Sequence, residues 1–215
     1  MKKYTSFIFD MDGTLVHNMH YHKDAWLQFL KLNGKQLSEK EWYAKNHGNI
    51  GEIIRRIFGE KFSDEEIFAM GEAKEALYRD IYKKDILPIT GLKDFLSKCT
   101  HKSTALATMG DHKNIEFTLE GLDLIGYFDV QLGGEDAHRG KPYPDIFLQA
   151  ADMLKVNPQE CLVFEDSFSG IEAAKSAEMD VVVLATTHSR EELASLQLDY
   201  IIEDYHDPLL NSFLK

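Results

Sequence analysis

The chain has 215 residues, 44% of them hydrophobic and 28% charged, a composition that suits a globular protein with one good core and room for a smaller second unit. The formal net charge is -12 and no basic stripe is visible, which argues against a nucleic-acid partner. The longest apolar run, Val181 to Ala185, has the length of a strand and excludes a membrane span. The amino terminus lacks the features of a signal peptide, so we expect a cytoplasmic protein with no membrane partner.

The two cysteines, Cys99 and Cys161, lie far apart in the sequence and have no metal-binding spacing. Cys161 begins a strand-like apolar run, where a buried and unreactive thiol is expected. The sequence therefore predicts two free thiols and no disulfide framework.

The amino-terminal segment predicts a strand followed by a helical insertion. A β-prone run from Thr5 to Phe9 ends at Asp10 and is followed by a turn. From about His20 to Tyr82, apolar residues recur at helical spacing, and Ser63 to Glu66 has the pattern of a capping box. We expect residues 16–87 to form a helical insertion, and residues 1–15 and 88–215 to form the core.

After Gly91, predicted helices alternate with predicted strands. This alternation is typical of an α/β protein with a Rossmann-like, doubly wound parallel sheet, to which the first strand also belongs. The expected helices cover residues 92–98, 114–121, 144–154, 170–177 and 190–196. The expected strands after the first cover residues 103–108, 128–132, 161–164, 181–184 and 200–202.

Polar side chains follow several of these strands at the point where each strand ends. Because ligands of parallel sheets bind beyond the carboxyl ends of the strands, we expect these side chains to meet at one edge. Four separate segments contribute to the set, which comprises Asp10, Asp12, Thr108, Lys141, Glu165 and Asp166.

These residue types favour phosphoryl transfer. Carboxylates that converge without His or Cys partners favour a hard cation bound by oxygen, and Mg²⁺ is the usual choice. Lys141 and Thr108 suit the oxygens of a phosphate group. A carboxylate such as Asp10 can attack phosphorus, and a second carboxylate two residues later can act as general acid and base.

The segment from Phe9 to Leu15, Phe-Asp-Met-Asp-Gly-Thr-Leu, resembles the opening motif of the haloacid dehalogenase superfamily. Three later motifs of that family are matched in order by Thr108, by Gly140-Lys141-Pro142, and by Glu165-Asp166-Ser167 with Gly170. The resemblance covers the whole chain. The inserted helical cap is similar to that of the β-phosphoglucomutases and their sugar-phosphatase relatives.

The resemblance implies a role for each matched residue. Asp10 would be the nucleophile and Asp12 the general acid and base, a residue that the dehalogenases and phosphonatases of the family lack. Thr108 and Lys141 would hold the phosphoryl group. The Mg²⁺ ligands implied by the family are the Asp10 carboxylate, the Asp12 backbone carbonyl and Asp166, with Glu165 bound to the metal or next to it.

The inserted helices and the segment after Thr108 depart from the mutase pattern. Met109 stands where many relatives have a small or amide residue, and it is expected at the substrate. Gly51 replaces the cap arginine of the mutases, whereas Lys74 matches the cap lysine and is either a substrate-binding residue or a solvated helix residue. His22 has a plausible supporting role near Asp12. The neighbouring His17 and His20 are expected to be exposed, because the three histidines fit no zinc motif.

Three functions remain open from the sequence. The favoured one is a Mg²⁺-dependent phosphatase, a phosphoric monoester hydrolase, for a small phosphorylated metabolite such as a sugar phosphate. The second is a β-phosphoglucomutase-type isomerase that uses the same phospho-enzyme. The third is a catalytically silent binding protein on the same fold. The sequence names neither the substrate nor the oligomeric state.

Overall fold

The computed structural model describes residues 2–214, apart from the side chain of Tyr43. The chain divides into two compact units. The core unit comprises Met1–His17 and Leu87–Lys215, and the helical unit comprises Asn18–Ile86. For comparison, the sequence placed the insertion at residues 16–87.

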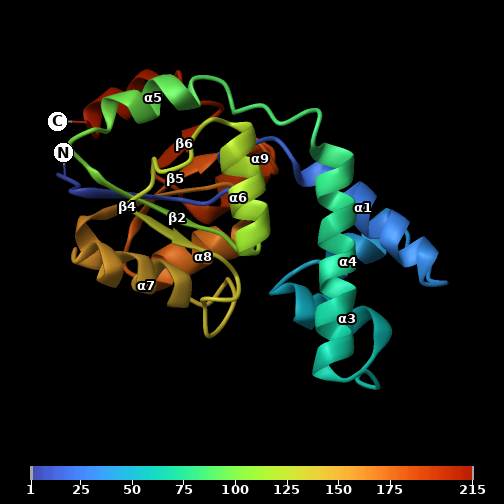
Figure 1. Cartoon of the computed structure of the whole chain (residues 1–215). Helices are drawn as coiled ribbons and strands as arrows, with labels where there is room; N and C mark the ends of the chain where they lie inside the picture. Colours follow the sequence, from blue (N-terminus) through green and yellow to red (C-terminus); the bar gives the residue numbers. More distant parts are fainter. Residues whose placement is uncertain (1, 215) are drawn as a thin grey trace. The chain divides into compact units, whose positions relative to one another are not determined.

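The core unit is built on a six-stranded sheet in which neighbouring strands are parallel, with the order β3-β2-β1-β4-β5-β6 (Figure 1). This confirms the predicted doubly wound, Rossmann-like α/β fold. The strand order reverses beside β1, so the first strand of the chain lies at the centre of the sheet. The strands are β1 (Ser6–Phe9), β2 (Ser103–Ala107), β3 (Val130–Leu132), β4 (Cys161–Glu165), β5 (Asp180–Leu184) and β6 (Tyr200–Ile202).

Helices cover both faces of this sheet. In Figure 1, α5 lies on the opposite side of the sheet from α7 and α8. The helices of the core unit are α5 (Leu92–Lys98), α6 (His112–Gly121), α7 (Asp145–Leu154), α8 (Phe168–Ser176) and α9 (Arg190–Leu193). The helix predicted to reach Leu196 ends at Leu193 and continues as a 3₁₀ turn, Ala194–Leu196.

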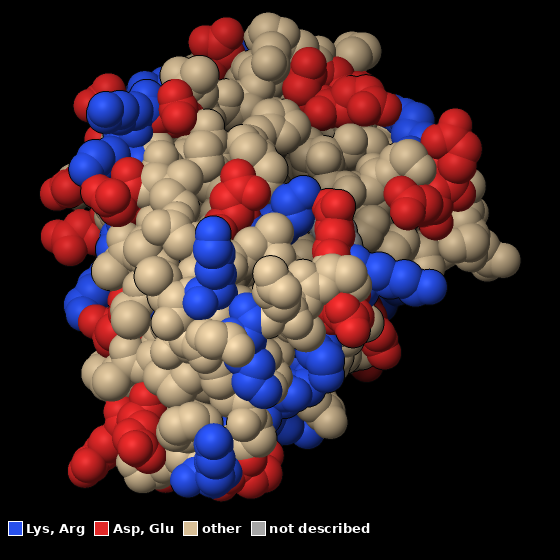
Figure 2. Space-filling model, turned by 90° about the vertical axis from the view of Figure 1, so that its right-hand side faces the viewer, with Lys and Arg blue, Asp and Glu red and all other residues tan. Residues whose placement is uncertain are grey.

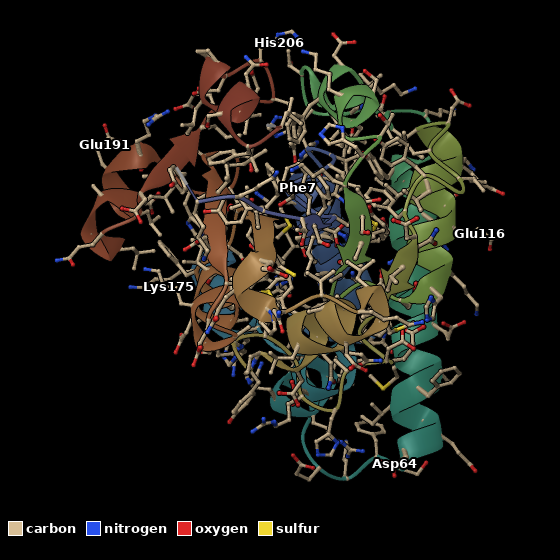
Figure 3. The ribbon with its side chains drawn as sticks, turned by 90° about the vertical axis from the view of Figure 1, so that its left-hand side faces the viewer. Phe7, Asp64, Glu116, Lys175, Glu191 and His206 are labelled. Carbon is tan, nitrogen blue, oxygen red and sulfur yellow. The ribbon has the colours of Figure 1, made fainter. Side chains whose placement is uncertain are left out.

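The alternation of side chains along β1 divides the core between the two faces. Ile8 belongs to the apolar cluster that includes the buried residues of α7 and α8. Phe7 and Phe9 point to the other face, where Phe9 stacks on Phe164 with ring centroids 4.5 Å apart. Figure 3 shows Phe7 in the interior of the unit, whereas Glu116 lies at its periphery. A strand buried on both faces explains why residues 6–9 carry no charge.

Both cysteines are buried free thiols, as the sequence predicted. Burial raises the pKa of Cys99 to about 12 and that of Cys161 to about 11.

Among residues 2–214, no helix is both long enough and apolar enough to cross a membrane. On the face shown in Figure 2, acidic and basic side chains are interspersed, and neither covers the whole face.

The helical unit has its own apolar cluster, which includes Trp26, Trp42 and Ile54. Its helices are α1 (Met19–Leu32), α2 (Glu39–Lys45), α3 (Ile50–Phe58) and α4 (Asp64–Tyr82). The predicted capping box of α4 is confirmed, because Ser63 and Glu66 each accept the other's backbone N–H. Leu32 follows the helical spacing of the buried residues but is 70% exposed, since it lies at the last position of α1.

Candidate active site

The register of the sheet brings three strand ends to the same level. Phe9 pairs with Leu106 of β2 and with Phe164 of β4. The backbone N–H of Asp10 donates to the carbonyl of Phe164 at 3.0 Å, which fixes the first residue beyond β1. The residues that follow β1, β2 and β4 therefore begin side by side at the carboxyl edge of the sheet.

A buried ion cluster lies at this edge. The Lys141 Nζ donates to Asp10 Oδ1 at 2.6 Å, to Glu165 Oε1 at 2.8 Å and to the carbonyl of Ala107 at 3.3 Å. All three residues are buried: Lys141 is 4% exposed, Asp10 is 6% exposed and Glu165 is 1% exposed. Burying charged groups is unfavourable unless they are paired, so this arrangement is typical of a functional site.

Both carboxylate oxygens of Glu165 are engaged. While Oε1 accepts from Lys141, Oε2 accepts from the backbone N–H groups of Asp166 and Ser167, each at 2.7 Å, and from Ser167 Oγ at 3.0 Å. The side chain packs against Gly170 of α8, where an added Cβ would lie 1.7 Å from Glu165 Oε1. Gly170 of the fourth motif is therefore required by the position of Glu165.

Asp166 completes a group of three acids. Ligand oxygens of Asp10, Glu165 and Asp166 lie within 4.8 Å of one another, and Asp166 is 2% exposed. Thr14 Oγ1 donates to Asp166 Oδ1 at 3.4 Å, and Thr187 Oγ1 donates to Asp166 Oδ2. These three carboxylates offer a donor set made only of oxygen, which fits a hard divalent cation such as Mg²⁺.

Two carboxyl groups of the cluster, those of Asp10 and Asp166, resist ionisation. Burial raises the pKa of Asp10 to about 8, with Glu165 and Asp12 adding to the rise and Lys141 opposing it. Burial, together with Glu165 and Asp10, also raises the pKa of Asp166 well above its ordinary value. Burial alone would lower the pKa of Lys141, but the two carboxylates beside it outweigh burial and raise that pKa. A bound cation would relieve the repulsion between the acids.

Asp12 and Thr108 lie beside the segment that follows β2. A Cβ added to Gly110 would be 3.6 Å from both Asp12 Oδ2 and Thr108 Oγ1, which places these two side chains near the same backbone. Thr108 is 1% exposed, and its Oγ1 accepts from the N–H of Gly110 at 3.1 Å. The side chain of Met109 is partly buried against the apolar cluster that includes Ile8. Asp12 is not a member of the group of three acids.

Lys74 and His22, the predicted substrate-binding residues of the insertion, meet inside the helical unit. Lys74 is 2% exposed, which is contrary to its interpretation as a solvated helix residue. Its Nζ lies 3.0 Å from His22 Nδ1 and 2.8 Å from Glu75 Oε1, and 5.3 Å from the ring centroid of Trp26. His22 stacks on Tyr78 with centroids 3.7 Å apart. These contacts bring the two residues together within one unit.

The sequence interpretation missed two hydroxyl donors of the site, Thr14 and Thr187. Thr14 is part of the first motif, which implies no metal-site role for it. Thr187 follows β5 at the same sheet edge as the other site residues. The signal in the sequence that points to Thr187 is its position three residues after the predicted strand 181–184.

Comparison with known proteins places this geometry in a family. A sequence model of the haloacid dehalogenase-like hydrolases matches residues 4–178. A fructose-1-phosphate phosphatase from Escherichia coli is 30% identical over 84% of this chain and 96% of its own length. A β-phosphoglucomutase from Bacillus subtilis is 29% identical over 81% of this chain and 80% of its own.

Among solved structures, a family IA haloacid dehalogenase hydrolase from Entamoeba histolytica superposes with a TM-score of 0.85 at 30% identity, covering 97% of each chain. The chain belongs to the haloacid dehalogenase-like hydrolases, and it is an enzyme. The resemblance seen in the four motifs is thereby confirmed.

Proposed function

We propose that this chain is a Mg²⁺-dependent phosphatase that hydrolyses a small phosphorylated metabolite, in particular a sugar phosphate, through an aspartyl-phosphate on Asp10. The observation that carries the proposal is the buried group of three acids around Lys141 at the carboxyl edge of the sheet. Similarity to a fructose-1-phosphate phosphatase supports the substrate class.

In this proposal carboxylate oxygens of Asp10 and Asp166 and the backbone carbonyl of Asp12 would hold the metal. Both oxygens of Glu165 already accept hydrogen bonds, which favours a place for Glu165 next to the ligands, where it holds Lys141. When bound, Mg²⁺ would neutralise negative charge on the transferring phosphoryl group.

Lys141 and Thr108 hold the phosphoryl group in front of Asp10. A carboxylate oxygen of Asp10 attacks phosphorus, and the bond from phosphorus to the leaving alkoxide breaks as Asp12 donates a proton to that oxygen. Asp12 then takes a proton from water, which attacks the aspartyl-phosphate and releases inorganic phosphate. One carboxylate thus serves both half-reactions. Catalysis of phosphoryl transfer rests mostly on positioning and charge stabilisation, so an active site for this reaction is expected to contain buried and oriented groups.

We propose that Met109, Lys74 and His22 also bind the substrate. Lys74 supplies a buried cation whose contacts with His22 and Glu75 fix its position within the helical unit. Met109 follows Thr108 directly, so its backbone has a defined place at the sheet edge.

The two arginines of α3 favour hydrolysis over isomerisation. A mutase must retain the substrate by its second phosphate, for which a bidentate arginine is the best group. Gly51 stands at the arginine position of the mutases, so in a mutase Arg55 or Arg56 would have to replace that arginine. Arg55 binds Asp64 and Glu60, and Arg56 donates to the carbonyls of Lys45 at 2.6 Å and His47 at 2.8 Å. Both guanidinium groups are thus engaged with their own unit.

The test is a phosphate-release assay over a panel of sugar monophosphates, run with Mg²⁺ and with EDTA. We expect release only with Mg²⁺ and none from Asp10→Asn, whereas Asp152→Asn, the same change at an exposed position of α7, should stay active. Activity that survives metal removal would refute the metal requirement, and activity of Asp10→Asn would refute the nucleophile.

A coupled assay for conversion of β-glucose 1-phosphate to glucose 6-phosphate, run beside the panel, separates the two reactions. Isomerisation with little free phosphate would favour the mutase. Absence of both activities over the panel would favour a silent binding protein.

A further inference from the structure

The loop that follows β5 supplies hydroxyl groups to the site. Thr186 Oγ1 donates to the carbonyl of Gly13 at 2.5 Å, and Thr187 Oγ1 donates to Asp166 Oδ2. The next residue, His188, stacks on Phe168 with ring centroids 4.0 Å apart. The loop is therefore attached to the first motif, to Asp166 and to the start of α8.

The contacts at Asp166 are close. A Cβ added to Gly13 would lie 2.0 Å from Asp166 Oδ2 and 2.8 Å from Thr187 Oγ1, so these three groups share one small space. The carboxylate of Asp166 cannot turn without breaking the bond to Thr187. The contact with Asp166 Oδ1 is different, because Thr14 approaches it only to 3.4 Å, near the upper limit for a hydrogen bond.

We infer that Thr187 is a positioning residue that restricts Asp166 to one-oxygen binding of the metal and thereby favours Mg²⁺ over Ca²⁺. With Oδ2 committed to the Thr187 hydroxyl, Oδ1 is the oxygen of Asp166 available to a cation. This inference rests on the proposed function, because it concerns the metal site of that reaction.

The physical basis is the difference between the two ions. Mg²⁺ takes about six oxygens in an octahedron at about 2.0–2.1 Å, whereas Ca²⁺ takes about six to eight at about 2.3–2.6 Å and often binds both oxygens of a carboxylate. A carboxylate held by a hydroxyl on one oxygen suits Mg²⁺. For Ca²⁺ to bind both oxygens, the bond from Thr187 must break. Groups that orient a metal ligand typically change metal affinity by about 10–100-fold.

Binding of Mg²⁺ and of Ca²⁺, measured separately by isothermal titration calorimetry on the whole chain, tests this inference. We expect Thr187→Val to lower the affinity for Mg²⁺ by about tenfold and to change Ca²⁺ affinity much less, so that the ratio of the two affinities falls. Thr187→Ser, which keeps the hydroxyl, should restore the ratio to within about twofold. Thr187→Ala, measured beside Thr187→Val, excludes an effect of the valine methyl group.

Thr186→Val is the matched control, since it removes a hydroxyl from the same loop but from a bond to Gly13. It should leave the ratio unchanged. Equal losses for both ions in Thr187→Val and Thr187→Ala, or no loss, would overturn the inference while leaving the proposed function intact. A wild-type chain that binds no Mg²⁺ would overturn the metal requirement of the proposed function, and this inference with it.

Discussion

Replacing the proposed nucleophile should make the metal-free protein more stable while it abolishes turnover. Asp10→Asn has nearly the same shape and can still accept a hydrogen bond from Lys141. It cannot ionise, and it stands in a site where Glu165 and Asp166 are also buried. Active sites commonly hold such unfavourable charges, so stability and activity are expected to change in opposite directions.

The size of the gain follows from the pKa of Asp10. Burial raises this pKa from 3.8 to about 8, and each pH unit between the two values is equivalent to about 1.4 kcal/mol. At pH 7 the difference spans about three units, which sets an upper limit of about 4 kcal/mol. When Asp10 is neutral, Asp166 and Lys141 change their own proton binding, and this change offsets part of the gain in stability. We therefore expect Asp10→Asn to gain about 1–3 kcal/mol at pH 7 without metal.

The raised pKa of Asp10 also determines the direction in which the stability of the wild-type protein changes with pH. Between about pH 4 and pH 8 the folded chain keeps a proton on Asp10 that the unfolded chain has lost, so the wild-type protein loses stability as the pH rises. The Asn variant lacks this titration. Its advantage should be close to zero near pH 4 and should grow up to about pH 8.

Urea unfolding in EDTA at several pH values, followed by circular dichroism, measures this advantage as a shift of the midpoint. Asp152→Asn serves as the control for an exposed acid-to-amide change, and its shift should be small at every pH. Adding Mg²⁺ should reduce or reverse the advantage, because only the wild-type site keeps all its acids and binding stabilises the folded state. An advantage that does not depend on pH, or a less stable variant at pH 8, would refute the reasoning.

Three further experiments, two of them with substituted chains, test other parts of the site and core. Asp12→Ala should slow hydrolysis of an alkyl phosphate by about 10²–10⁴-fold, and an unchanged rate would remove it from the acid and base role. The thiols of Cys99 and Cys161, with pKa values of about 12 and 11, should not react with Ellman's reagent at pH 8 until urea unfolds the chain. Gly170→Ala should destabilise the protein by about 1–3 kcal/mol in urea and lower activity, because its Cβ would displace the buried Glu165; unchanged stability would contradict this packing.

The sequence anticipated the elements of the core unit well, because buried parallel strands and amphipathic helices have strong local patterns. The strand at residues 200–202 and the helix at residues 92–98 have the predicted bounds, and β1 begins one residue later than expected. The expected strand at residues 128–132 is shorter, Val130–Leu132, since only these residues pair with β2. Strand bounds depend on the partner strand, which the local pattern does not contain.

In the helical unit, too, the local sequence pattern does not determine the contacts of single side chains. The spacing of apolar residues indicated helices, but it could not decide whether Lys74 is solvated or buried, because a lysine fits either face of a helix. The contacts with His22, Glu75 and Trp26 decide it, and these residues come from two different helices. The engagement of Arg55 and Arg56 likewise depends on partners outside α3, at the end of α2, in the loop after it and at the start of α4.

The amino-acid sequence by itself determined the family, the parallel sheet and the strand ends at which the acids Asp10 and Asp166 stand. These properties follow from local periodicity and from short motifs whose residues are close in the chain. Only the tertiary structure decided that Lys141 joins Asp10 to Glu165, and that Thr187 holds one oxygen of Asp166. Hydrogen bonds between residues far apart in the chain require placement to within a fraction of an ångström. That placement comes from the register of the sheet and the packing of its helices.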